Sequence, residues 1–138
     1  MRGTWDRRRA AAVAIGGAAG AALRWAVLTT VEPGSFPWPV LVINIVGSLL
    51  LGAVLAEEWA HPSARLVLHD LAGIGFCGGL TTFSTFAVEI VDLSRDGRLG
   101  TAVIYGVASV VGALAGIVVG AAALRRARAV TLPLEEQP

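Results

Sequence analysis

Four long apolar stretches constrain the fold of this chain more than any other feature of its sequence. Each has about the 20 residues that an α-helix needs to cross the hydrocarbon core of a bilayer. They span roughly residues 10–31, 38–56, 66–93 and 101–124. The connections between them are short and contain Pro, Gly, Glu and Asp, as polar turns do. The sequence therefore predicts an all-α membrane protein with a single four-helix transmembrane domain.

The overall composition agrees with a location in the membrane. Hydrophobic residues make up 55% of the chain and charged residues 15%, and the mean hydropathy is +0.70. Because no connection is long enough to form a soluble catalytic domain, any function must reside in the spans. We expect no enzyme activity and no nucleic-acid partner, and we expect residues 125–138 to form a disordered tail.

A motif rich in glycine and hydroxyl residues interrupts the third apolar stretch. Residues 75–86 read GFCGGLTTFSTF. A broken helix is tolerated inside a bilayer only where the freed backbone groups are buried in protein or line a hydrated cavity, because each unsatisfied group in hydrocarbon costs several kcal/mol. We therefore expect the third helix to be broken near its middle and the break to mark a binding or conduction site.

Two aromatic side chains and one amide are the main candidates for that site. Phe83 and Phe86 are three residues apart, so their rings project from nearly one face of a helix. The positive edge of a phenyl ring can replace part of an anion's hydration without trapping the anion at a fixed charge. Asn44, near the middle of the second span, offers both N–H donors and a carbonyl acceptor. Ordinary packing and an interhelical hydrogen bond are the competing interpretations.

Charged and hydroxyl residues in the spans supply further candidates. Arg24 lies in the first span, where a charge is costly. It either attracts anions into a vestibule or is a structural charge that pairs with Glu89 or with a helix C-terminus. In the fourth span Tyr105 and Ser109 place two hydroxyl groups one helical turn apart. The next position on that line is Ala113, so the polar track stops there.

Glycines recur at four-residue spacing in three of the spans, which lets helix backbones approach closely. The positions are Gly16 and Gly20, Gly75 and Gly79, and Gly112, Gly116 and Gly120. For the fourth span we favour plain helix packing. Because four short helices enclose little volume, such faces also suggest that two chains assemble into the working unit.

Three motifs together resemble the bacterial fluoride-channel family called Fluc or CrcB. They are residues 16–25 (GGAAGAALRW), 44–52 (NIVGSLLLG) and 75–86. The resemblance implies a channel in the bacterial plasma membrane through which fluoride leaves the cytoplasm passively. It also implies an antiparallel dimer, formed with itself or with a paralogue, that has two pathways and a structural sodium ion at the break.

The resemblance also assigns roles to particular residues. It implies a fluoride pathway lined by Asn44, Phe83, Phe86, Ser84 and Thr85 and extended by Tyr105 and Ser109. It implies that the backbone carbonyls of Gly78 and Thr81 bind the sodium ion. Ala113 departs from the hydroxyl residue that some members have, which puts the far end of one pathway in doubt.

A small four-helix multidrug or cation exporter is the alternative. Such a protein needs an acidic residue deep in the first span to exchange protons, whereas the only charge there is Arg24. A scaffold protein would explain the glycines but not the set of Asn44, Phe83 and Phe86. An intramembrane hydrolase would need a mid-span His or Asp beside a nucleophile.

Arginines flank the spans unevenly. If the N-terminus is cytoplasmic, eight arginines lie on the cytoplasmic side and only Arg95 and Arg98 on the other. Positive charge near span ends favours the cytoplasm. We therefore expect the chain to insert mainly with its N-terminus inside and to pair with an oppositely oriented paralogue.

Overall fold

The computed structural model describes residues 6–31, 34–56 and 61–131, and every regular element in these ranges is a helix. The elements are α1 (Arg7–Thr30), α2 (Trp38–Leu55), α3 (Pro62–Ala64), the π-helix η1 (Arg65–Cys77), α4 (Gly78–Leu80), α5 (Phe83–Arg95) and α6 (Leu99–Thr131). Four segments are long and apolar enough to cross a membrane: Arg7–Thr30, Trp38–Leu55, Pro62–Arg95 and Leu99–Val130. The prediction of an all-α protein with four spans is confirmed.

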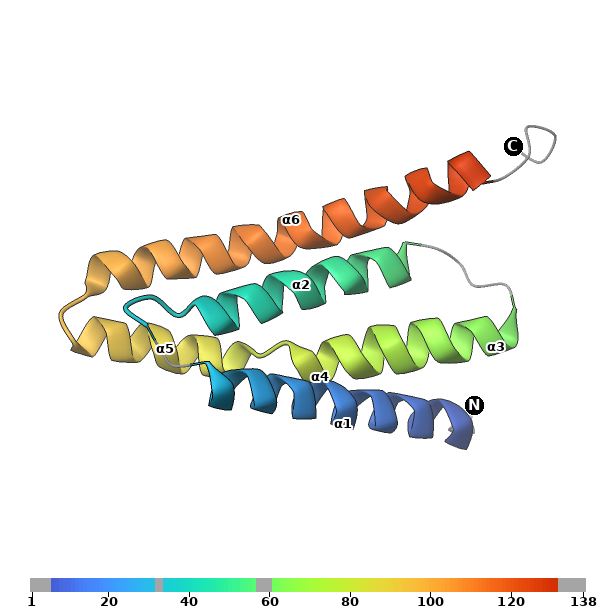
Figure 1. Cartoon of the computed structure of the whole chain (residues 1–138), viewed down its shortest axis with the longest axis horizontal. Coiled ribbons are helices and arrows are strands. Elements are labelled where there is room, and N and C mark those ends of the chain that lie inside the picture. The colour runs from blue at the N-terminus through green and yellow to red at the C-terminus, as the bar shows by residue number, and fades with distance from the viewer. Residues whose placement is uncertain (1–5, 32–33, 57–60, 132–138) are drawn as a thin grey trace, which may run out of the picture.

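The spans lie side by side along their length (Figure 1). α1 packs on η1 and α4, α2 packs on α6 and η1, and α5 packs on α6. The third span therefore lies between α1 on one side and the α2–α6 pair on the other. The start of α1, the start of the third span and the end of α6 share one end of the bundle, and the turn between α5 and α6 lies at the other.

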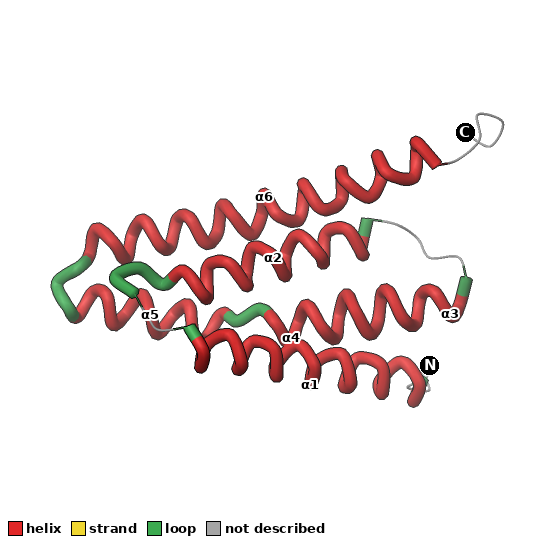
Figure 2. Tube along the Cα trace, in the orientation of Figure 1, coloured by secondary structure: helices red, strands yellow, loops and turns green. Residues whose placement is uncertain are grey.

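The third span is broken at Thr81 and Thr82, as the sequence predicts. The backbone of Thr81 (φ −73°, ψ 155°) and of Thr82 (φ −147°, ψ 125°) is extended. Figure 2 shows this short extended segment between the two helical halves. α5 then restarts with Thr82 as its N-cap, because the Thr82 hydroxyl accepts a hydrogen bond from the Thr85 N–H at 3.2 Å.

The spaced glycines bring the helix backbones into direct contact. A Cβ atom on Gly20 of α1 would collide with the backbone carbonyl of Phe76 in the third span. A Cβ atom on Gly120 of α6 would likewise collide with the carbonyl of Leu49 in α2. The helix-packing interpretation of the glycines in the fourth span is thus confirmed, and those of the first span have the same role.

α6 extends further than the sequence analysis expects. It continues to Thr131, so the expectation of disorder is wrong for residues 125–131; residues 132–138 lie outside the described residues. The cause is local, since Ala, Leu and Arg make up residues 121–129 and are strong helix formers. A helix of 33 residues is about 50 Å long at a rise of roughly 1.5 Å per residue, which exceeds the bilayer core.

Candidate functional site

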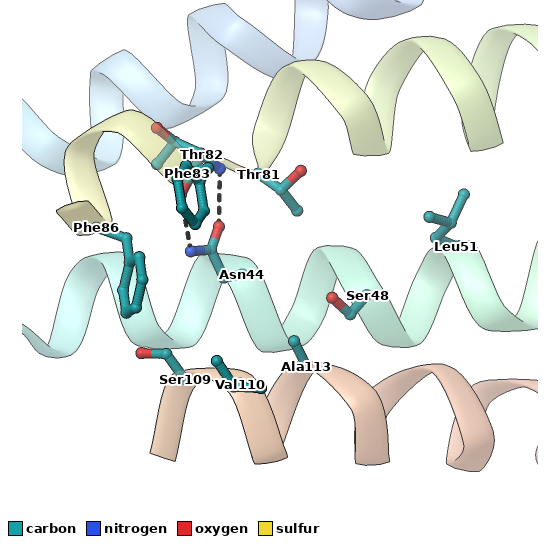
Figure 3. A pocket seen from close by; sticks show the side chains of 10 residues that line it. All are labelled: Asn44, Ser48, Leu51, Thr81, Thr82, Phe83, Phe86, Ser109, Val110 and Ala113. Atoms are coloured by element: carbon teal, nitrogen blue, oxygen red, sulfur yellow. Dashed lines mark hydrogen bonds between the residues drawn. The ribbon is translucent and has the colours of Figure 1, made fainter. Parts of the chain in front are cut away.

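Asn44 of α2 holds the backbone of the break (Figure 3). Its Nδ2 donates to the carbonyl of Thr82 at 3.0 Å, and its Oδ1 accepts from the N–H of Thr82 at 2.8 Å. In a continuous helix the Thr82 N–H would donate to the carbonyl of Gly78. Asn44 thus replaces a hydrogen bond of the helix itself. Because an amide nitrogen carries two N–H groups, one remains for a ligand.

A pocket of about 270 Å³ opens beside this contact, between α2, the break and α6. It is lined by Asn44, Ser48, Leu51, Thr81, Thr82, Phe83, Phe86, Ser109, Val110 and Ala113 (Figure 3). The structure therefore brings together four of the side chains that the sequence analysis selects for the pathway: Asn44, Phe83, Phe86 and Ser109. None of the described residues that line the pocket is charged.

The two phenyl rings lie next to each other at this pocket. Their centroids are 5.7 Å apart and their planes are tilted by 46°. Phe83 is 79% exposed, whereas Phe86 is partly buried. Phe83 is therefore the more accessible of the two rings.

Ser109 contributes a buried hydroxyl that has no hydrogen-bond partner among the described residues. The residue is 5% exposed and lines the pocket. Leaving a buried polar group unsatisfied costs about 1–3 kcal/mol. The pocket thus presents a donor that a ligand in it would satisfy.

Tyr105 packs against Phe86 and does not line the pocket. Its hydroxyl donates to Oε2 of Glu89 at 2.5 Å, and the residue is 0% exposed. Its ring lies 5.3 Å from that of Phe86 and 5.6 Å, edge-on, from that of Phe36. The Tyr105 hydroxyl is therefore committed to Glu89 in this structure.

Ser84 and Thr85 also lie outside the pocket lining. Their hydroxyls are 3.3 Å and 3.0 Å from the hydroxyl of Thr82, the N-cap of α5. Both residues thus belong to the cap network that supports the break. Their role in the pathway stays a prediction.

Arg24 reaches the end of the first half of the third span. Its Nη1 donates to the carbonyl of Thr81 at 2.7 Å. A cation at a helix C-terminus interacts favourably with the helix dipole. Of the pairings that the sequence left open, the structure has the one with a helix C-terminus, and Glu89 bonds to Tyr105 instead.

An ion pair that the sequence analysis did not select joins α1 to η1. Arg9 donates from Nε to Oδ2 of Asp70 at 2.6 Å and from Nη2 to Oδ1 at 2.9 Å. His69 Nδ1 lies 2.8 Å from the same Oδ1, and Asp70 is 1% exposed. The sequence feature that could have indicated this pair is the carboxylate of Asp70, which lies inside an apolar stretch. Neither residue of the pair lines the pocket.

A second groove, between α1 and α2, offers nothing to an ion. It measures about 400 Å³, and all nine described residues that line it are apolar. Lipid chains are the natural occupants of such a surface in a membrane. The pocket at the break is therefore the candidate site.

Four spans and an uncharged pocket beside a broken helix define the class: a multi-pass membrane protein with a small cavity at the break of its third span. Comparison with known sequences identifies the family. Residues 11–121 match the family described as "CrcB-like protein, Camphor Resistance (CrcB)", and the chain belongs to this family.

Several bacterial relatives are similar over most of their length. "Fluoride-specific ion channel FluC" of Bordetella petrii is 41% identical over 117 residues, which cover 85% of this chain and 91% of the relative. The protein of the same name from Novosphingobium aromaticivorans is 42% identical over 121 residues, 82% and 93% of the two chains. "Fluoride-specific ion channel FluC 1" of Mycobacterium tuberculosis is 37% identical over 125 residues, 89% and 95%. This multi-pass protein accordingly lies in the bacterial plasma membrane.

Proposed function

We propose that this protein is a fluoride-specific ion channel through which fluoride leaves the cytoplasm passively. The observation that carries the proposal is the pocket at the break, where the Asn44 amide, the unpaired Ser109 hydroxyl and two phenyl rings meet without a fixed charge. The relatives named as fluoride channels and the family match support it. An ion channel is not an enzyme, and the proposal needs no catalytic step.

The uncharged lining suits the transport of an anion that must also be released. N–H and O–H donors and positive ring edges replace water around the ion. A fixed positive charge in the pocket would hold the ion more strongly and slow its exit. Neutral hydrofluoric acid crosses membranes and ionises inside the cell. A membrane potential that is negative inside then drives the anion out with about 2.3 kcal/mol per charge per 100 mV.

Ion release from proteoliposomes tests this function. With a potassium ionophore to balance charge, vesicles loaded with potassium fluoride should lose fluoride rapidly, and vesicles loaded with potassium chloride should keep their chloride. Equal leakage of both anions, or no leakage of fluoride from vesicles that contain the complete assembly, would contradict the proposal. Uptake of an organic cation driven by an imposed proton gradient, without fluoride release, would favour the multidrug or cation exporter.

We also propose that the working unit is an antiparallel dimer in which a second chain covers the face of the break. That face is open in the single chain. Phe83 is 79% exposed, and a Cβ atom added to the exposed Gly78 would meet no atom within 4 Å. A partner on this face would enclose the pocket on the side where it is now open.

A sodium ion fits the backbone at this face. The Gly78 carbonyl has lost its usual helical donor, because the Thr82 N–H donates to Asn44. The Thr81 carbonyl accepts a hydrogen bond from Arg24 and keeps a second lone pair. We propose that these two carbonyls are one chain's share of the site. A bound cation would stabilise these carbonyl oxygens, which are electron-rich and incompletely paired.

Sodium should therefore be needed for assembly. Replacing sodium by N-methylglucamine during purification should shift the protein from dimer to monomer on gel filtration in detergent, and adding sodium back should restore the dimer. Adding the same concentration of choline serves as the control for ionic strength. A dimer that persists after exhaustive removal of sodium would contradict this proposal.

The orientation of the chain can be tested independently. The start of α1 and the end of α6 share one end of the bundle (Figure 1), and arginines are concentrated there, as in Arg7–Arg9 and Arg125–Arg126. We expect C-terminal reporter fusions to be active only in the cytoplasm. Equal reporter activity on both sides, together with full channel activity of this chain expressed alone, would contradict pairing with an oppositely oriented paralogue. It would favour a homodimer of this chain.

A further inference from the structure

The hydroxyl track on α6 stops at Ala113, and the structure brings a different hydroxyl to the same stretch of the pocket. Ser48 of α2 and Ala113 of α6 both line the pocket (Figure 3). Ser48 lies one helical turn beyond Asn44. It also lies at the contact between the two helices, because a Cβ atom added to Gly116 would be 3.4 Å from the Cβ of Ser48.

The hydroxyl of Ser48 is free to bind a ligand. Hydroxyls on other helices of the bundle bond back to the carbonyl four residues earlier, as Thr30 of α1 does to Ala26 at 2.7 Å and Ser94 of α5 to Ile90 at 2.7 Å. In the described part of the chain, the Ser48 hydroxyl makes no such bond. Because Ser48 is partly exposed and lines the pocket, this donor is accessible from it.

We propose that Ser48 is a fluoride ligand. Its hydroxyl on α2 would continue the series of hydrogen-bond donors that ends on α6 at Ser109, before Ala113. The inference rests on the proposed channel function and adds a binding residue to it. An ion that leaves Asn44 and Ser109 toward the end of the bundle where α1 begins and α6 ends would pass the Ser48 hydroxyl next. In a chain inserted with its N-terminus inside, this is the cytoplasmic half of the pathway.

The competing explanation is that Ser48 is small only to let α2 approach α6. The two explanations differ in what Ser48→Ala does. Alanine is no larger than serine, so the helix contact at Gly116 is kept, and only the hydroxyl is lost. A packing residue would tolerate the change, whereas a ligand would not.

The experiment compares four proteins in the fluoride-release assay: the wild type, Ser48→Ala, the double variant Ser48→Ala with Ala113→Ser, and Ser94→Ala. We expect Ser48→Ala to lower the fluoride rate roughly tenfold, as the loss of one hydrogen bond to an ion predicts. Ala113→Ser should restore most of that rate, because it returns a hydroxyl to the same stretch from α6. Ser94→Ala, which removes an exposed hydroxyl of α5, should behave like the wild type.

Two outcomes would overturn the inference while the channel function stands. One is a wild-type rate in Ser48→Ala. The other is a reduced rate that Ala113→Ser fails to restore, because the serine would then be needed for something other than a donor in the pathway. If the wild type itself released no fluoride, the channel function would fail and this inference with it.

Discussion

Replacing Asn44 by aspartate should reduce the fluoride rate about a thousandfold. A carboxylate at this position would face the pocket, and two like charges about 4 Å apart repel by roughly 4 kcal/mol at the effective dielectric constant near a protein surface. The variant also loses the Nδ2 donor to the Thr82 carbonyl, so two oxygens would face each other at the break. The measurement is the initial rate of fluoride release from proteoliposomes, with protein recovery and gel-filtration profile recorded for each variant.

Asn44→Ala separates these two effects. It removes both hydrogen bonds to Thr82 but adds no charge, so its rate should lie well above that of Asn44→Asp. Equal losses in the two variants would show that Asn44 acts only by holding the break. A wild-type rate in Asn44→Asp would show that fluoride does not pass this residue.

Replacing Phe86 by isoleucine should lower the fluoride rate about thirtyfold. Isoleucine keeps an apolar side chain at the pocket but removes the aromatic ring with its positive edge. A desolvated cation on the face of an aromatic ring is stabilised by about 2 kcal/mol, and a contact of the same size between an anion and the ring edge corresponds to the stated factor. The rate is measured as for Asn44→Asp. Phe83→Ile should act in the same direction.

Phe76→Ile is the matched control for this prediction. Phe76 lies in η1 on the same span and is partly buried, but it does not line the pocket. Its substitution should leave the fluoride rate near that of the wild type. If Phe86→Ile remained dimeric and conducted normally, the phenyl rings would be packing residues. If Phe76→Ile lost as much activity as Phe86→Ile, the effect of Phe86→Ile could not be assigned to the pocket.

The spans and the break could be predicted because their signals are local. Apolar length and composition alone place four segments in the membrane. The Gly and Thr residues of 75–86 disfavour a continuous helix whatever surrounds them. The spacing of Phe83 and Phe86 likewise places two rings on one face, and both line the pocket. The glycine spacing indicated close packing, although it did not say which helices would meet.

The partners of the polar groups could not be predicted because they depend on which helices are neighbours. The sequence left three roles open for Arg24, and the position of α1 against the third span selects the carbonyl of Thr81. The Arg9–Asp70 ion pair joins residues far apart in the chain. Tyr105 and Ser109 lie on one line of α6, yet only Ser109 lines the pocket, whereas Tyr105 packs on Phe86 and donates to Glu89.

By itself the sequence determined that this protein is a four-span membrane protein with a broken third helix, because hydropathy and backbone preference act within one segment. The packing of the helices places Asn44 where it replaces a helical hydrogen bond at the break and Ser48 where it lines the same pocket as Ala113. In a bilayer each polar group must find a partner on a neighbouring helix or in a ligand. Which partner it finds follows from how the helices pack.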